Sequence, residues 1–209
     1  MENSFDIIII GGGPGGYKTA TYAASKGLTV LVVEKAELGG TCLNCGCIPT
    51  KTYARNAEII QTLKEADVYG LDELSFSFNF KTAYERKNNV IDALRNGIST
   101  LLSAPGITVV KGEAVLKSAS SVYVNGEEYS AKNIIIATGS ESKTLPIAGL
   151  DADMICDSTW LLSTDTLPKR ICIVGAGVIG MEFASILNSF GCEVSVVEFL
   201  KECLSALCG

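Results

Sequence analysis

The chain has 209 residues, of which 47% are hydrophobic and 19% are charged, a composition that supplies a folded core and excludes a disordered protein. Its formal net charge of −6, without a long basic run, argues against a surface for nucleic acid or anionic membranes. The longest apolar runs are strand-sized, and the first residues lack the basic segment of a secretory signal. We therefore expect a cytoplasmic protein with neither nucleic acid nor membrane among its partners.

Taken in chain order, the hydrophobic pattern predicts an α/β fold in which buried parallel strands alternate with helices. We expect a strand at 7–10, a helix, a strand ending near 34, helices at 47–66 and 80–102, extended segments at 107–116 and 121–124, a turn at 125–126, a return strand from 127, and a buried strand at 133–137. The mostly polar residues 141–168 predict an irregular connector, which separates domains at 1–150 and 151–209.

An internal repeat accounts for the two ends of the chain. Residues 7–34 align without a gap on residues 171–198, and twelve of the 28 positions are identical. The identities fall on glycines, on strand hydrophobics and on one terminal glutamate. Each copy predicts a strand, a glycine turn, a helix and a second strand, so we expect two Rossmann-like units with two nucleotide sites.

The first copy carries the glycine pattern Gly11-x-Gly13-x-x-Gly16 between a strand and a helix, with Glu34 at the end of the next strand. Gly11 permits a tight turn, Gly13 lets a pyrophosphate approach the backbone, and Gly16 lets helix and strand pack closely. The helix N-terminus offers N–H groups to phosphate, and Glu34 can accept hydrogen bonds from ribose hydroxyls. This combination predicts dinucleotide binding.

The second copy repeats the pattern as Gly175-x-Gly177-x-x-Gly180, with Glu198 in the place of the acid. A carboxylate there repels a 2′-phosphate, which favours NAD over NADP. The alternative is that Glu198 only ends a strand in solvent.

A cysteine-rich segment at residues 39–51 lies between the copies, with Cys42 and Cys47 five residues apart. A helix expected to begin near Cys47, and Lys51 one turn later, both favour a thiolate. Such a thiolate beside a second cysteine is what a dithiol/disulfide redox centre requires. A structural disulfide, buried thiols, or a metal held by Cys42, Cys45 and Cys47 remain alternatives, although no fourth ligand is evident and the chain contains no histidine.

The segment from Gly40 to Lys51, with a glycine motif on either side, resembles the redox-disulfide region of the flavin-dependent pyridine nucleotide–disulfide oxidoreductases. Among those enzymes it is most similar to the members that oxidise dihydrolipoyl groups with NAD⁺. The resemblance covers the whole chain.

The resemblance implies FAD on the first copy, NAD on the second, and a redox disulfide between Cys42 and Cys47. Cys47 would face the flavin, Cys42 would exchange with substrate, and Glu182 would pair with Lys51. The implied FAD contacts are Gly11, Gly13, Gly16, Glu34, Gly40, Thr41, Lys51, Ala114, Thr138, Gly139 and Ser140, and the implied NAD contacts are Gly175, Gly177, Gly180 and Glu198.

By the same resemblance, a dihydrolipoyl dithiol on a lipoyl-bearing protein or a small dithiol reduces the disulfide. The electrons then pass through FAD to NAD⁺, and the full-length enzyme is a homodimer. No metal is implied.

Three departures from the family pattern matter. Position 45, usually aliphatic, is a cysteine; the family's thiol base, a histidine on a C-terminal domain, has no counterpart; and the chain is about half the family's length. We therefore expect the 209 residues to be an N-terminal part that does not turn over alone. Glutathione or mercuric reductase-like enzymes, and a non-catalytic flavin-binding module, are the rival interpretations.

Overall fold

The computed structural model describes residues 3–143, 146–149 and 152–204. The chain forms two compact units, the first from residues 1–47 and 91–157 and the second from residues 48–90 and 158–209. The division into binding domains at 1–150 and 151–209 concerns cofactors and stays a prediction.

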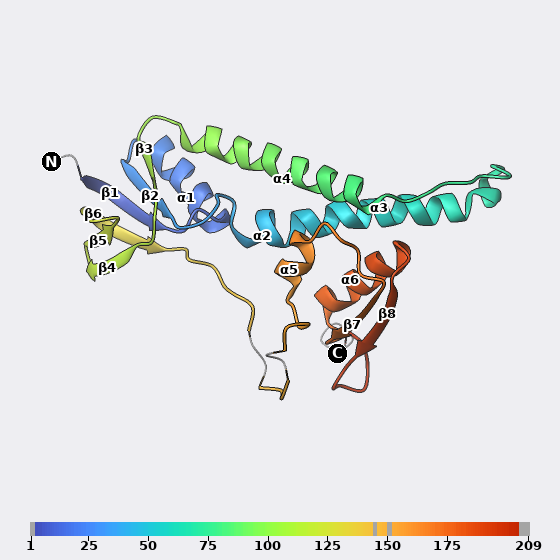
Figure 1. Ribbon diagram of the computed structural model, residues 1–209. Coiled ribbons are helices and arrows are strands. Elements are labelled where there is room, and N and C mark those ends of the chain that lie inside the picture. The colour runs from blue at the N-terminus through green and yellow to red at the C-terminus, as the bar shows by residue number, and fades with distance from the viewer. Residues whose placement is uncertain (1–2, 144–145, 150–151, 205–209) are drawn as a thin grey trace. The chain divides into compact units, whose positions relative to one another are not determined.

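The first unit is built on a six-stranded sheet in the order β3-β2-β1-β6-β5-β4 (Figure 1). Its elements are β1 (Ser4–Ile10), α1 (Pro14–Ser25), β2 (Val30–Glu34), α2 (Gly40–Cys45), β3 (Ile107–Lys111), β4 (Val115–Ser118), β5 (Ser121–Val124) and β6 (Glu127–Ile136). The strands β3, β2, β1 and β6 are parallel, whereas β5 and β4 continue the sheet antiparallel. This mostly parallel sheet confirms the predicted α/β class.

Strand order places the ligand-binding edge of this sheet. From β1 the chain passes through α1 to β2 on one side, while β6 pairs with β1 on the other. The direction of strand order therefore reverses at β1, and open α/β sheets bind ligands beyond the carboxyl ends of strands at such a point. The glycine turn that follows β1 lies at this edge.

Continuous runs of Ile and Val build the core of the first unit. Ile8, Leu31 and Val33 are fully or almost fully buried, because β1 and β2 are central strands. Residues 107–116, expected to be extended, form β3 and the start of β4. Gly112 lies between the two strands, where a Cβ would lie only 2.6 Å from Asn125 Oδ1. One expectation was wrong. The strand expected at 133–137 is the end of β6, and it is not buried: Ile136 is 65% exposed.

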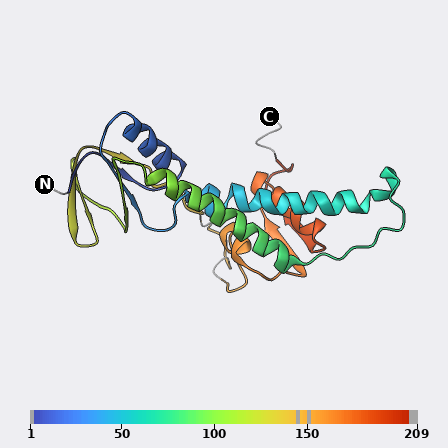
Figure 2. The same ribbon diagram turned by 90° about the horizontal axis from the view of Figure 1, so that it is seen from above.

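The second unit combines long helices with a small parallel sheet. It contains most of α3 (Cys47–Lys64), η1 (Ala66–Tyr69), the first half of α4 (Phe80–Leu102), α5 (Ser158–Ser163), β7 (Arg170–Val174), α6 (Val178–Ser189) and β8 (Glu193–Val197). The helices expected at 47–66 and 80–102 are thus confirmed. The first half of α4 passes beside α3 (Figures 1 and 2), where Arg86 on α4 donates to Thr52 O at 3.2 Å and to Asn56 Oδ1 at 3.1 Å.

The segment expected to be an irregular connector contains the helix α5. Leu161 and Leu162 on this helix are buried, and they pack with Tyr53, Phe183 and Phe190 in the core of the unit. Because most of the surrounding residues in 141–168 are polar, the sequence pattern did not reveal this short apolar helix.

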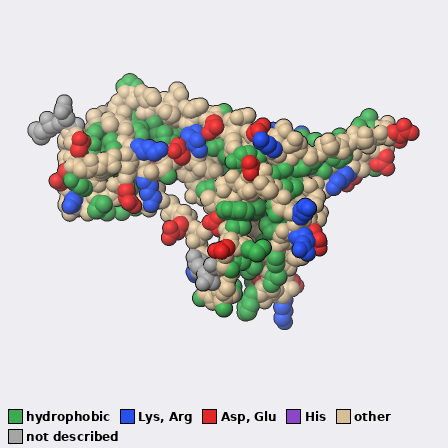
Figure 3. All heavy atoms as spheres, viewed as in Figure 1, with side chains coloured by type: hydrophobic (Ala, Val, Ile, Leu, Met, Phe, Trp, Pro, Cys, Tyr) green, Lys and Arg blue, Asp and Glu red, His purple; other side chains and the backbone are tan. Residues whose placement is uncertain are grey.

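Strands β7 and β8 differ from the buried strands that their Ile and Val runs predicted. Val174 and Val197 are both more than half exposed, because among the described residues the sheet has two strands only. Apolar side chains accordingly gather on the visible face of this part of the unit (Figure 3). Within the described ranges, we find no helix that is both long and apolar enough to cross a membrane.

A buried lysine joins α4 to α5. Lys87 is 3% exposed, and its Nζ donates to the carbonyl of Leu162 at 2.5 Å. The same ammonium lies 4.3 Å from the ring centroid of Tyr84 and 5.8 Å from that of Tyr53. Burial lowers the pKa of Lys87 from 10.5 to about 8, because desolvation disfavours the charged form.

This lysine predicts a pH dependence of stability. Between pH 8 and 10.5 the unfolded chain holds the Lys87 proton more tightly than the folded chain, so the free energy of unfolding should rise with pH, by about 1–3 kcal/mol across this window. Lys87→Met should lack this rise. Urea unfolding followed by the fluorescence of Trp160, which lies on α5, measures the difference. The exposed Lys81→Met on the same helix controls for loss of a charge, and parallel profiles for unsubstituted protein and Lys87→Met would contradict the prediction.

Candidate functional site

The first glycine turn joins β1 to α1. Gly11 has φ +109°, a left-handed conformation that favours glycine, and its N–H donates to Val33 O at 2.7 Å. A Cβ on Gly11 would lie 2.2 Å from the carbonyl oxygen of Ala137, which follows β6. The role predicted for Gly11, a tight turn, is therefore required by the backbone.

Close packing of α1 on β1 depends on Gly16. A Cβ there would lie 1.8 Å from Gly11 O and 3.5 Å from a methyl of Ile9. Gly13 is the N-cap residue of α1 and is extended, and no side chain caps this helix end. The N-terminus of α1 thus points its backbone N–H groups toward the sheet edge without a carboxylate or hydroxyl of its own, as a phosphate site requires.

Glu34 binds the glycine turn to the end of β2. Its Oε2 accepts from Gly12 N at 2.6 Å and its Oε1 accepts from Ala36 N at 2.8 Å. Each carboxylate oxygen has a second lone pair that can accept a hydrogen bond from a ribose hydroxyl. The sequence predicted the ribose role and missed this structural one.

The cysteine-rich segment packs directly on the same turn. Gly39 N donates to Gly12 O at 2.9 Å, and a Cβ on Gly40 would lie 2.8 Å from the Cα of Gly13. Leu38 approaches as closely, because a Cβ at Gly12 would lie 2.8 Å from its Cδ2. The structure therefore brings Gly40, and with it the neighbouring Thr41, to the first glycine turn, while their contacts with a flavin stay predictions.

The two predicted redox cysteines lie on consecutive helices. Cys42 is half-buried on α2, a short helix that the sequence pattern did not reveal, and Cys47 is exposed at the first position of α3. Gly46 separates the two helices. The predicted position of Cys47 at a helix N-terminus is confirmed, with Lys51 exposed one turn later. The disulfide and the thiolate stay predictions.

The remaining predicted FAD contacts lie beyond the ends of strands in the first unit. Ala114 lies between β3 and β4 and packs on the core. Thr138, Gly139 and Ser140 follow β6, directly after Ala137, whose N–H donates to Ile10 O at 2.8 Å. This hydrogen bond places their segment beside the glycine turn.

The second glycine turn reproduces the first. Gly175 has φ +107°, Gly177 caps α6 in the same extended conformation as Gly13, and a Cβ on Gly180 would lie 2.1 Å from Gly175 O. Glu198 accepts from Ala176 N at 2.6 Å and from Leu200 N at 2.8 Å. These backbone donors, that of Leu200 first, hold the pKa of the Glu198 carboxyl below its ordinary value.

Glu182 and Lys51, a predicted pair, both belong to the second unit. Glu182 is exposed on α6 and lines a hollow of about 430 Å³ together with residues of α3 such as Glu58 and Gln61. Within residues 3–143, 146–149 and 152–204 no ion pair joins Glu182 to Lys51, so their pairing stays a prediction. In those same residues no three His, Cys, Asp or Glu side chains are arranged to hold a metal ion.

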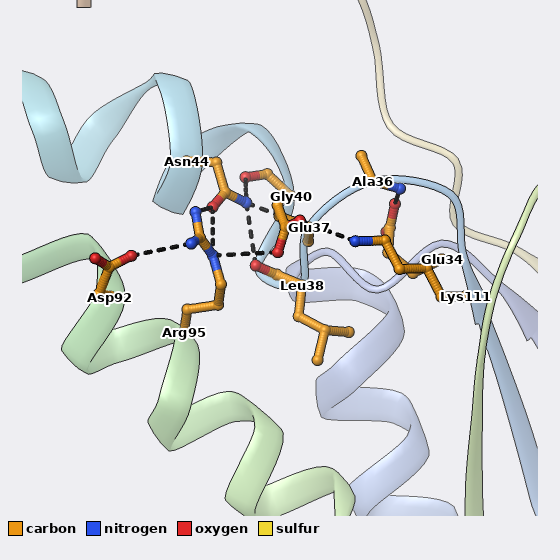
Figure 4. A network of polar contacts seen from close by, with 9 residues as sticks. All are labelled: Glu34, Ala36, Glu37, Leu38, Gly40, Asn44, Asp92, Arg95 and Lys111. Atoms are coloured by element: carbon orange, nitrogen blue, oxygen red, sulfur yellow. Dashed lines mark hydrogen bonds and ion pairs between the residues drawn. The ribbon is translucent and has the colours of Figure 1, made fainter. Parts of the chain in front are cut away.

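Sequence reasoning missed a polar network beside the cysteines, drawn in Figure 4. Asn44 lies between them in the sequence, and Arg95 reaches it from α4. Asn44 was visible within the motif, whereas nothing in the sequence pattern singled out Arg95, because the two are 51 residues apart.

Comparisons with known proteins agree with this geometry. The family model for pyridine nucleotide-disulphide oxidoreductases matches residues 5–208. The chain is 42% identical over 212 residues to dihydrolipoyl dehydrogenase from Acholeplasma laidlawii and 41% identical over 217 residues to that from Bacillus subtilis. A solved structure of the HOCl-induced flavoprotein disulfide reductase RclA from Escherichia coli, in a Cu(II) complex, matches with a TM-score of 0.85 at 33% identity and covers 97% of the chain.

These relatives are longer than the chain. The alignment with the Acholeplasma protein covers 99% of this chain but only 63% of that relative. The alignment with the Bacillus protein covers 46% of that relative. This chain likewise covers 44% of the RclA chain.

Proposed function

Because the chain belongs to the pyridine nucleotide–disulphide oxidoreductase family, we propose that it supplies the flavin site and redox disulfide of a dihydrolipoyl dehydrogenase. The observation that carries this proposal is the contact between the first glycine turn and the cysteine segment, through Gly39 and Gly40. A dinucleotide on that turn and a disulfide on that segment would be neighbours.

The residues at this edge fit FAD. Gly13 leaves bare backbone that a pyrophosphate could approach, while Gly11 and Gly16 permit the turn and the close helix packing that shape the site. The uncapped N-terminus of α1 suits phosphate charge. Glu34 offers lone pairs to a ribose, and residues 138–140 follow Ala137, which is hydrogen-bonded to Ile10 beside the turn. When bound, FAD would carry two electrons between the protein dithiol and NAD⁺.

The chain's own chemistry is thiol–disulfide exchange. A dihydrolipoyl thiolate attacks Sγ of Cys42, forms a mixed disulfide and releases Cys47 as a thiolate. The second substrate sulfur then attacks the first, closes the cyclic disulfide and releases Cys42. The substrate loses two electrons and the protein dithiol gains them. The N-terminus of α3 favours Cys47 as the leaving thiolate.

The second glycine turn is proposed to bind NAD, with Glu198 on the adenine ribose. Lipoyl-bearing proteins or small dithiols are the proposed substrates of the whole protein, which we propose to be a cytoplasmic homodimer. Turnover needs a thiol base, and the 209 residues contain no histidine.

A visible spectrum tests the proposal. Purified protein containing this chain should be yellow, dithionite should bleach it, and NAD⁺ added without oxygen should restore the colour. Protein that is colourless after reconstitution with FAD, or that keeps its cysteines equally reactive before and after reduction, would contradict the proposal.

Substitution of Glu198 tests the choice of nucleotide. Glu198→Ala in the whole protein removes the carboxylate that would repel a 2′-phosphate, so the preference for NADH over NADPH should fall about tenfold, or roughly 1.4 kcal/mol. FAD content should not change. Glu193→Ala, at the opposite end of β8, is the matched control. An unchanged NADH/NADPH ratio of kcat/KM would exclude a ribose role for Glu198.

A further inference from the structure

The side-chain amide of Asn44 forms hydrogen bonds with several backbone carbonyls of the loop that precedes it. Its Nδ2 donates to Leu38 O and Gly40 O at 3.0 Å each, and to Glu37 O at 3.3 Å (Figure 4). The amide has two N–H groups for these three carbonyls, so one N–H is shared between two of them, and the contact with Glu37 O is the longest. Both N–H groups of Asn44 are used on the loop, and its Oδ1 points away from the loop, where it can accept hydrogen bonds.

Arg95 on α4 supplies the donors for that oxygen. Its Nη2 donates to Asn44 Oδ1 at 2.8 Å and its Nε at 3.3 Å, while its Nη1 donates to Asp92 at 3.0 Å. The Arg95 side chain is 30% exposed, and the carboxylate of Glu37 lies 3.7 Å from its Nε. A planar guanidinium provides this fork of donors, whereas a lysine ammonium does not.

Helix α2, which carries Asn44, is too short to be stable without contacts to the rest of the unit. Helix α2 has six residues, and neither Gly39 at its start nor Gly46 at its end contributes a capping side chain. Isolated helices of this length are unstable in water. Its position therefore depends on tertiary contacts, which include those of Asn44, the burial of Leu43, and those of Gly39 and Gly40 with the glycine turn.

We infer that Arg95 is a positioning residue, which acts through Asn44 to hold the Cys42-bearing helix α2 against the first glycine turn. This inference rests on the proposed function, because it assigns to α4 the support of the redox disulfide beside the flavin. The chain of contacts runs from α4 through Asn44 to the carbonyls of the loop, and from Gly39 N to Gly12 O.

Arg95→Met tests the inference by hydrogen exchange of the whole protein. Amides of residues 40–45 should exchange about tenfold faster or more, the factor that matches loss of hydrogen bonds from a charged donor. Amides of β1 should not change. Arg55→Met, which breaks a comparable arginine–carboxylate pair with Glu58 at 2.9 Å, is the control and should leave α2 unchanged. Unchanged exchange in residues 40–45, or equal acceleration in β1, would overturn the inference.

Two further variants separate the parts of the network. Asn44→Asp keeps an acceptor for Arg95 but loses the amide donors to the loop, so it should match Arg95→Met. Arg95→Lys keeps the charge but not the fork, so α2 should again exchange faster. Normal exchange in either variant would overturn the assigned contacts.

A spectroscopic measurement links the network to the redox centre. After two-electron reduction, the long-wavelength absorbance from thiolate to flavin should fall at least twofold in Arg95→Met at equal FAD content. If the unsubstituted protein lacks this band, the proposed function fails. If the unsubstituted protein has it and Arg95→Met retains it in full, only the positioning role fails.

Discussion

Gly16→Ala is expected to destabilise the first unit by more than about 3 kcal/mol and to abolish flavin binding. The added methyl would lie 1.8 Å from the backbone carbonyl oxygen of Gly11, and a Cβ has no torsion angle that could turn it away, so α1 must move away from β1. That movement opens the turn on which the pyrophosphate would lie. Urea unfolding followed by circular dichroism, together with the ratio of flavin to protein absorbance, measures both effects.

Gly15→Ala is the matched control for stability. A Cβ at Gly15 would lie 3.8 Å from the Ala137 side chain, an ordinary contact, so this helical substitution should stabilise by about 0.5–1 kcal/mol. Gly180→Ala is the counterpart in the second copy, where the methyl would lie 2.1 Å from Gly175 O. It should abolish NADH binding and spare FAD. A Gly16→Ala protein as stable as the Gly15→Ala protein would contradict the close packing.

The second large effect is expected from the cysteines. Reduction should convert the unsubstituted chain, which has eight cysteines, from six titratable thiols to eight under denaturing conditions, since one disulfide occupies two. Both Cys42→Ser and Cys47→Ser should show seven thiols before and after reduction. Cys42→Ser should keep a long-wavelength absorbance from the Cys47 thiolate to the flavin, and Cys47→Ser should have none.

Cys45→Ser is the matched control, because Cys45 lies on α2 three residues after Cys42. It should still gain two thiols on reduction, from five to seven. A gain of two in Cys42→Ser and none in Cys45→Ser would mean that Cys45 forms the disulfide. Absence of the long-wavelength absorbance in Cys42→Ser would mean that the roles of the two predicted cysteines are reversed.

The sequence predicted best where local pattern and backbone geometry coincide. The gapless repeat of residues 7–34 at 171–198 is matched by α1 and α6, by the positive φ angles of Gly11 and Gly175, and by the hydrogen bonds of Glu34 and Glu198. The helix beginning at Cys47 was predicted for the same reason, since Pro49 and the following pattern are typical of a helix start.

Prediction failed where tertiary contacts decide the structure. Helix α2 has a glycine at each flank and no amphipathic period, so its stability depends on tertiary contacts, among them those of Asn44, of the buried Leu43 and of the glycine turn. The exposure of β7 and β8 could not be predicted either, because an Ile and Val run does not say how many strands lie beside it. Arg95 was missed because its partner is distant in sequence.

The contact between Leu38 and the first glycine turn explains why the middle residues of the two turns differ. Position 12 is glycine, since a methyl there would push aside the leucine, whereas Ala176 at the equivalent position is accommodated and 1% exposed. The hydrogen bonds of the acid are the same in both copies, so the nucleotide site itself does not impose this choice. The cysteine-bearing segment after β2 thus restricts which residues position 12 can hold, so the two glycine turns are not interchangeable although their backbones match.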